Sequence, residues 1–176
     1  KKILKKTVNS LKAGNIVSLP TETVYGLAAS AYSKKAVGKI FKLKKRPKKN
    51  PLIIHYYRLK DLKKDVILNE YFFKLYKKFC PGPITFILKR RIDTKVVSIA
   101  SANLGTLAVR FPKHKIARSI LRYLQFPLAM PSANLSSNLS PVYARDVFED
   151  FKKKFSIIID GGKSKIGIES TVIDLT

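Results

Sequence analysis

Five blocks of polar and charged side chains along this sequence are of the types that bind carboxylates and phosphates. They supply hydroxyl, guanidinium, ammonium and imidazole groups at expected strand ends or in tight loops, at residues 18–27, 44–47 with 50–55, 107–112, 131–134 and 169–171. Such groups hold anionic oxygens through charge-assisted hydrogen bonds. No block alone establishes a site, but the ordered set predicts a pocket for an anionic small molecule.

Arg110 is the strongest single indication of such a pocket. It interrupts the apolar run 107–111, and an arginine in a buried strand requires an anionic partner or a cleft. His55 also interrupts an apolar strand, where a hydrogen-bonded core histidine is the commoner explanation. Arg110 therefore predicts contact with a carboxylate or phosphate, whereas His55 alone leaves both explanations open.

The other blocks each have an ordinary structural explanation. Thr21 or Thr23 could cap a helix, and Lys44 and Arg46 could simply favour the negative end of a helix dipole. The serine and asparagine of residues 131–134 are also common turn formers. Only their order along one chain favours a shared binding site.

Several common nucleotide-binding and catalytic signatures are missing from the sequence. It has no Walker A sequence, no Gly-x-Gly-x-x-Gly after a strand and no Gly-x-Ser-x-Gly around Ser132. His55 and His114 have no cysteine or carboxylate neighbours at metal-ligand spacing, which disfavours structural zinc. If the chain binds a nucleotide, it uses a less common type of site.

The elements that must position these blocks alternate between helices and strands. Helical spacing of apolar residues predicts helices at 4–11, 34–45, 71–79, 116–124 and 142–155. Short apolar runs predict strands at 16–19, 52–56, 84–88, 107–111, 128–130, 156–159 and 172–175. The alternation is typical of an α/β domain. Because three consecutive βαβ units are not evident, we expect a mixed sheet rather than a Rossmann fold.

The composition is that of a folded and strongly basic protein. The 176 residues are 45% hydrophobic and carry a formal net charge of +25. This length favours one domain with a substantial core, and no apolar run approaches the roughly 20 residues of a membrane span. Of the 36 basic residues, 28 are lysines, which suits either an RNA-binding face or general lysine enrichment in an AT-rich genome. The single cysteine, Cys80, and the lack of a secretory signal predict a reducing, cytoplasmic location.

Taken together, the ordered blocks resemble the YrdC family of threonylcarbamoyl-AMP synthases, over residues 16–175. The resemblance implies a three-layer α/β domain over 1–176, with a twisted mixed sheet flanked by helices and a basic concave face. It implies a nucleotidyltransferase that converts L-threonine, bicarbonate and ATP, with Mg²⁺, to threonylcarbamoyl-AMP and pyrophosphate. The product would pass to partner proteins that form threonylcarbamoyl-adenosine in tRNA. Catalysis would come from positioning, with no covalent intermediate and no dedicated catalytic side chain.

The same resemblance implies roles for individual residues. Those expected to contact threonine are Thr23, Tyr25, His55, Arg110, Met130 and Ser170. Those expected to contact ATP are Lys44, Arg46, Asn50, Thr106, Ser132, Asn134 and Ser140. Arg110 would hold the threonine carboxylate, and Met130 would act through its backbone.

Two departures from the family pattern stand out, and two other functions remain open. Lys45 occupies a position that is commonly glycine, and the chain stops at Thr176, before an arginine-containing segment that usually reaches the nucleotide.

The alternative function is a non-catalytic module that binds double-stranded or ribosomal RNA through its basic face. Carbamoyl transfer in hydrogenase maturation is a second alternative, but there a similar domain accompanies zinc motifs that this sequence lacks.

Overall fold

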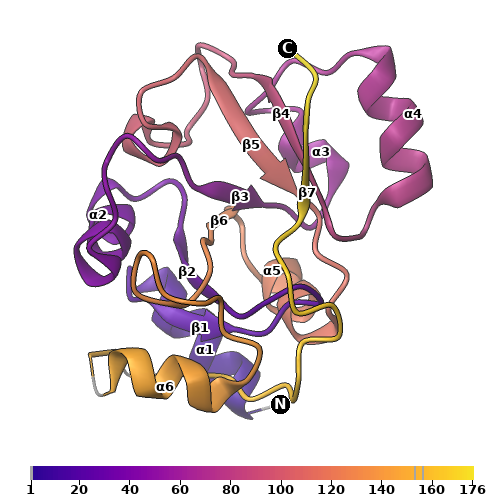
Figure 1. The fold of residues 1–176 in the computed structure, drawn as a ribbon. Coiled ribbons are helices and arrows are strands. Elements are labelled where there is room, and N and C mark those ends of the chain that lie inside the picture. Colours follow the sequence, from indigo (N-terminus) through magenta and orange to yellow (C-terminus); the bar gives the residue numbers. More distant parts are fainter. Residues whose placement is uncertain (1, 153, 156) are drawn as a thin grey trace.

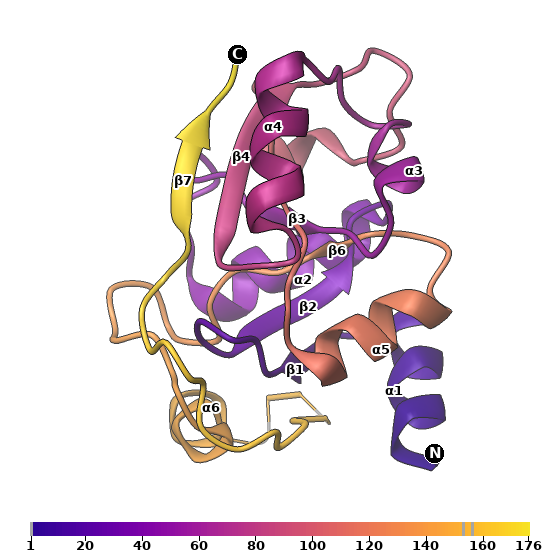
Figure 2. The same ribbon diagram turned by 90° about the vertical axis from the view of Figure 1, so that its right-hand side faces the viewer.

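A computed structural model describes residues 2–152, 154–155 and 157–176, which form a seven-stranded mixed sheet with helices on both faces (Figures 1 and 2). The strands are β1 (Val17–Leu19), β2 (Gly26–Ser30), β3 (Ile53–His55), β4 (Ile84–Lys89), β5 (Thr106–Arg110), β6 (Leu128–Ala129) and β7 (Thr171–Asp174). The helices are α1 (Lys2–Lys12), α2 (Lys34–Lys44), α3 (Leu59–Leu62), α4 (Glu70–Phe79), η1 (Ser98–Ser101), α5 (Lys115–Tyr123) and α6 (Ala144–Phe151). The predicted α/β fold is confirmed.

The strands lie in the order β1-β2-β6-β3-β5-β4-β7. The pairs β3–β5 and β4–β7 are parallel, and the remaining pairs are antiparallel. The sheet is therefore mixed, as the sequence predicts. The order also brings β3 and β5, which are some 50 residues apart in the chain, directly side by side.

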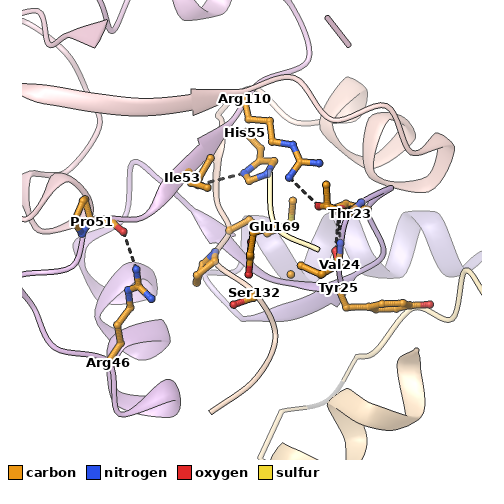
Figure 3. A pocket seen from close by; sticks show the side chains of 14 residues that line it. Thr23, Val24, Tyr25, Arg46, Pro51, Ile53, His55, Arg110, Ser132 and Glu169 are labelled. Atoms are coloured by element: carbon orange, nitrogen blue, oxygen red, sulfur yellow. Dashed lines mark hydrogen bonds between the residues drawn. The ribbon is translucent and has the colours of Figure 1, made fainter. Parts of the chain in front are cut away.

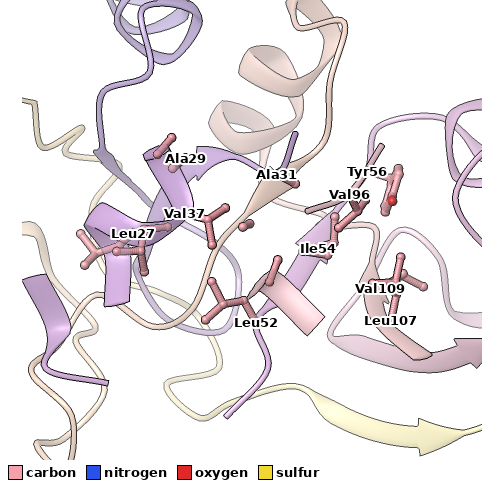
Figure 4. Close-up of a cluster of buried hydrophobic side chains, with 14 of the residues drawn as sticks. Leu27, Ala29, Ala31, Val37, Leu52, Ile54, Tyr56, Val96, Leu107 and Val109 are labelled. Atoms are coloured by element: carbon pink, nitrogen blue, oxygen red, sulfur yellow. The ribbon is translucent and has the colours of Figure 1, made fainter. Parts of the chain in front are cut away.

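Two apolar cores cover the two faces of the sheet. In β2, Leu27 and Ala29 belong to the larger core, which also contains residues of α2, α4 and α6, whereas Ala28 belongs to the core beneath α1 and α5. Figure 4 shows part of the larger core, with Val37 of α2 packed near the side chains of β2 and β3. Because side chains alternate between faces along a strand, β2 and also β6, through Ala129 and Leu128, divide their residues between the two cores.

Local signals explain where several helices begin and end. Ser33 caps α2 by accepting a hydrogen bond from the backbone N–H of Ala36, and Asn69 caps α4 in the same way. Helix α2 ends at Lys45, whose φ of 52° is left-handed, two residues before Pro47. Asp146 accepts hydrogen bonds from two backbone N–H groups ahead of α6, which fixes the start of that helix at Ala144.

The structure corrects three predictions of secondary structure. Strand β2 was not predicted, because Gly, Ala and Ser have low strand propensity and give no alternating pattern. The helix predicted at 142–155 extends only over Ala144–Phe151. The strand predicted at 156–159 is a single bridge between Ser18 and Ile158, and Ser156 itself lies outside the described residues. Among the described residues, no helix has both the length and the apolar character of a membrane span.

Candidate substrate-binding pocket

The strand register places a row of polar side chains on one face of the sheet. His55 of β3 lies opposite Arg110 of β5, and Arg110 lies opposite Thr85 of β4. Their strand neighbours Ile54 and Val109 point the other way, into the larger core. Polar residues at alternating positions of three adjacent strands thus converge on one face, and His55 and Arg110 line a pocket there.

Arg110 is held rigidly at the inner end of this pocket. Its Nη2 donates to Glu22 Oε1 at 2.7 Å, and its Nη1 donates to the hydroxyl of Thr23 at 2.9 Å (Figure 3). The side chain is buried, and its Nε has no hydrogen-bond partner among the described residues. Because a guanidinium has five N–H donors and these two hydrogen bonds use only two of them, Arg110 retains donor capacity for a ligand.

Glu22 is the buried counter-ion of Arg110. Its second carboxylate oxygen accepts hydrogen bonds from the backbone N–H groups of Lys113 and His114, just before α5. Burial alone would raise the pKa of Glu22, but the charge of Arg110 and these hydrogen bonds hold that pKa below its ordinary value. Glu22 is therefore ionised at neutral pH and fixes the guanidinium in place.

His55 presents a neutral imidazole to the pocket. Its Nδ1 lies 3.2 Å from the carbonyl oxygen of Ile53, which can only accept, so Nδ1 carries the proton and Nε2 is left as an acceptor. Burial, reinforced by the nearby charge of Arg110, lowers the pKa of His55 to about 3. The pocket thus pairs a permanent cation with an uncharged acceptor.

The outer part of the pocket is lined by Arg46, Ser132 and Glu169 (Figure 3). Arg46 follows α2 and is oriented by hydrogen bonds to the carbonyl oxygens of Asn50 and Pro51. Met130 and Pro131 also line the pocket. A guanidinium, a hydroxyl and a single carboxylate at an open rim suit a polyanionic group that enters from solvent.

Lys44 and Asn134 do not line the pocket, although the resemblance assigns both to ATP. The Lys44 ammonium donates to the carbonyl oxygens of Ser132 and Asn134 and to Asn134 Oδ1, and the residue is only 1% exposed. The Asn134 amide donates in turn to the carbonyl oxygen of Asn138. Both side chains use their polar atoms to hold the loop at 132–138.

The other residues assigned by the resemblance lie around the pocket rather than in its lining. Ser170 shares a hydrogen bond of 2.7 Å with the Thr85 hydroxyl, in the same polar row as Arg110. Ser140 donates to Glu169 at the rim, and Thr106 lies at the opposite end of β5 from Arg110. Asn50 is an exposed residue of the loop that orients Arg46.

Tyr25 lines the pocket, but its hydroxyl points elsewhere. The hydroxyl donates to the carbonyl oxygen of Gly162 at 2.7 Å and accepts from the backbone N–H of Gly161 at 3.0 Å. The ring is fully buried, and Figure 3 shows it directed away from Arg46 and Ser132. Tyr25 therefore joins the wall of the pocket to the segment at 161–162.

Sequence reasoning missed three residues that the structure places at this site. Glu22 pairs with Arg110, Thr85 continues its polar row, and Glu169 is a carboxylate at the rim. Thr85 interrupts an apolar strand exactly as Arg110 does in its own strand, so the same signal could have identified it. Glu22 and Glu169 lie within two of the five polar blocks, but acidic residues are ordinary in loops, so the sequence assigns neither a role of its own.

Comparison with known proteins identifies the family of this chain. A family model covering Sua5, YciO and YrdC proteins, described as "Telomere recombination", matches residues 9–176. A threonylcarbamoyl-AMP synthase of Pyrococcus abyssi is 46% identical over 169 residues, which cover 94% of this chain and 48% of that protein. The Bacillus subtilis enzyme of the same name is 42% identical over 165 residues, covering 93% of this chain and 47% of that protein.

A solved structure extends the comparison to the fold. The crystal structure of P. abyssi Sua5 complexed with L-threonine matches with a TM-score of 0.94 and 43% identity, over 98% of this chain and 50% of that one. The fold and pocket define a mixed α/β domain with a pocket, lined in part by Arg46 and Arg110, on one face of its sheet. The chain belongs to the Sua5/YciO/YrdC family. It spans about half the length of the two synthases it matches.

Proposed function

We propose that this protein is an L-threonylcarbamoyladenylate synthase, a nucleotidyltransferase that acts on L-threonine, bicarbonate and ATP. The observation that carries the proposal is the juxtaposition of Arg110, Thr23 and the neutral His55, in a fold that matches a threonine-bound relative with a TM-score of 0.94. A cation beside an uncharged acceptor is complementary to the carboxylate and amino group of an α-amino acid.

At the inner end of the pocket, threonine would be held by its two charged groups. Arg110 binds the carboxylate, and His55 Nε2 accepts a hydrogen bond from the amino group, which its neutral state permits. Thr23, Tyr25, Met130 and Ser170 complete the proposed threonine contacts, Met130 through its backbone. Because Glu22 already balances the charge of Arg110, the carboxylate is recognised chiefly through directed hydrogen bonds.

At the outer end, ATP would lie against the loops that follow α2 and β6. The proposed contacts of the nucleotide are Arg46, Asn50, Thr106, Ser132 and Ser140. Arg46 and Ser132 line the same pocket as the threonine residues, so the α-phosphate can approach the amino acid. Ser140 now donates to Glu169, and its hydroxyl would turn to a phosphate oxygen when the nucleotide binds.

In this proposal Mg²⁺ enters the pocket bound to the phosphates of ATP and is not held by the protein alone. Within residues 2–152, 154–155 and 157–176, no group of three or more histidine, cysteine or carboxylate side chains is arranged to hold a metal. Mg²⁺ in nucleotide sites is bound mostly by phosphates and water with one or two carboxylates, and Glu169 is the carboxylate that lines this pocket. The ion would supply neutralisation of phosphate charge.

The reaction then needs positioning more than a reactive side chain. The threonine amino group combines with bicarbonate to give a carbamate and water. A carbamate oxygen attacks the α-phosphorus of ATP, a new P–O bond forms, and the bond to pyrophosphate breaks. Arg46 and the hydroxyls of the outer end hold the phosphates in line, and no covalent enzyme intermediate is formed. The product would serve tRNA modification in the cytoplasm through downstream partner proteins.

The test of this function is pyrophosphate release by the purified chain. We expect release from ATP and Mg²⁺ only when both L-threonine and bicarbonate are present, together with threonylcarbamoyl-AMP detected by mass spectrometry. Release that needs neither threonine nor bicarbonate would contradict the proposed reaction. Tight RNA binding without any threonine-dependent release would favour the RNA-binding module, which the synthase names of the relatives do not support.

A further inference from the structure

We propose that Lys44 is a positioning residue. It sets the distance between Arg46 and Ser132, the two proposed phosphate contacts, without touching the nucleotide. This inference rests on the proposed function, because it assigns ATP to the outer end. It departs from the expectation that Lys44 is a direct phosphate ligand.

The hydrogen bonds of Lys44 leave no donor for a ligand. An ammonium group has three N–H donors, and Lys44 Nζ has three oxygen acceptors: the carbonyl oxygens of Ser132 and Asn134, and Asn134 Oδ1 at 3.1 Å. The backbone carbonyl of Lys44 also accepts a hydrogen bond from the N–H of Ser136. Both the side chain and the backbone carbonyl of Lys44 therefore connect helix α2 to the loop at 132–136.

These contacts connect the two proposed phosphate contacts. Arg46, two residues after Lys44, and Ser132, whose carbonyl Lys44 holds, both line the pocket. On its other side the loop is fixed by a hydrogen bond from Ala133 N–H to the carbonyl oxygen of Tyr25 at 2.7 Å. Lys44 thus completes a chain of contacts that determines how far the Ser132 hydroxyl lies from the Arg46 guanidinium.

Among the described residues, no carboxylate contacts the ammonium group of Lys44. The residue is 1% exposed, and its acceptors are neutral oxygens. Burial, followed by the charge of Arg46, lowers the pKa of Lys44 to about 8, and the more distant carboxylates of Glu169 and Asp150 oppose that shift. Below about pH 8 the buried ammonium therefore adds positive potential behind the nucleotide end of the pocket, and a bound polyanion would favour its protonated form.

The first experiment compares Lys44→Met with Lys42→Met, a matched change at an exposed lysine of the same helix. ATP and L-threonine are titrated separately into each protein by calorimetry, so the readout does not depend on turnover. We expect Lys44→Met to weaken ATP binding about 10- to 100-fold, as for a lost charged hydrogen-bond network, and to change threonine affinity less than about 3-fold. Lys42→Met should change neither affinity.

Two further measurements separate positioning from direct contact and from general instability. In a double-mutant cycle with Asn134→Leu, the double variant should lose no more ATP affinity than Lys44→Met alone, because both changes release the same loop. In the wild type, ATP affinity should fall by up to about tenfold between pH 8 and pH 9, as Lys44 loses its proton. Lys42→Met should keep this pH dependence.

Several outcomes would overturn the inference. Equal losses of ATP and threonine affinity in Lys44→Met would indicate a purely structural role, and additive losses in the cycle would indicate direct contact with a phosphate. Unchanged ATP affinity from pH 8 to pH 9 in the wild type would overturn it even if Lys44→Met fails to fold. If the wild type binds ATP but never forms threonylcarbamoyl-AMP, the proposed function is wrong. The ATP titrations would then still test the role of Lys44, because they do not depend on turnover.

Discussion

His55 and Arg110 are direct neighbours across the parallel strands β3 and β5, and both side chains face the same pocket. The two residues are 55 positions apart in the chain and meet only through the strand register. The charge of Arg110 adds to burial in keeping His55 unprotonated, so the pair combines one fixed cation with one neutral acceptor. This combination is what an amino acid's carboxylate and amino group require.

Arg110→Met should abolish most threonine binding and also destabilise the fold. We expect the threonine dissociation constant to rise at least about 30-fold, because truncating a buried, hydrogen-bonded charge costs about 2–5 kcal/mol and each 1.4 kcal/mol is about tenfold. The free energy of unfolding should fall by about 3–5 kcal/mol, because Glu22 keeps a buried charge without its partner. Calorimetric titration and urea denaturation measure the two effects.

The double variant Glu22→Gln/Arg110→Met separates these two effects. It removes both charges of the pair, so most of the lost unfolding free energy should return, while threonine binding stays weak. Recovery of threonine binding in the double variant would show that Arg110 acts only through stability. The proposed carboxylate contact would then be wrong.

His55 should remain neutral throughout the physiological pH range. Because its pKa is lowered to about 3, its contribution to stability is complete above the unfolded-state pKa of about 6.5 and is lost progressively as pH falls towards 3. Two-dimensional NMR of the imidazole nitrogens measures this directly, since the sequence contains only two histidines. A titration of His55 above pH 5 would contradict the buried, Nδ1-protonated state.

The sequence predicts most elements of this fold but not the arrangement of its site. Strands such as β4 and β5 are mostly apolar, and α2 has both helical spacing and the Pro47 stop, so their patterns identify them. Strand β2 consists of small residues apart from Leu27, and only tertiary structure reveals it as a strand.

The limits of prediction at the site have a similar physical cause. The residue types of Arg110 and His55 mark them as unusual in apolar strands, but only the pairing of β3, β5 and β4 shows that they form one row with Thr85. Lys44 illustrates the converse. The family resemblance of its motif predicts a contact with ATP, whereas the loop carbonyls that surround Lys44 become visible only in three dimensions.

If the lysine-rich surface binds RNA, that binding should depend on salt and not on the pocket. The logarithm of RNA affinity should fall linearly with the logarithm of salt concentration, with a slope of several units, because each lysine–phosphate contact releases counterions. Threonine affinity should change far less over the same range. Arg110→Met should weaken threonine binding much more than RNA binding, and equal losses would favour the RNA-binding module. Filter binding and calorimetry provide the two measurements.

Gly26→Ala should distort the wall between the two ends of the pocket. A Cβ at this position would lie 2.4 Å from Met130 Cγ and 3.2 Å from the carbonyl oxygen of Pro131, so the loop must shift. We expect a loss of about 1–3 kcal/mol in the free energy of unfolding and weaker binding of both substrates. Gly38→Ala is the control, because a Cβ there meets nothing within 4 Å and alanine favours the interior of α2 by about 1 kcal/mol. Equal behaviour of the two variants in urea denaturation would contradict the predicted steric conflict.

Lys45→Gly should stabilise the protein, because Lys45 adopts a left-handed backbone conformation with φ of 52° at the end of α2. A left-handed conformation costs a residue with a Cβ about 1–2 kcal/mol, whereas glycine adopts it freely, although glycine also loses more backbone entropy on folding. We therefore expect a net gain of about 0.5–1 kcal/mol in urea denaturation. Lys42→Gly, within the same helix, should instead lose about 1 kcal/mol, because there the backbone is helical and glycine only adds flexibility. If Lys45→Gly raises the free energy of unfolding and Lys42→Gly lowers it, the cause is the backbone conformation and not the lost charge. If both variants lower the free energy of unfolding, the Lys45 side chain stabilises the protein by more than its left-handed conformation costs.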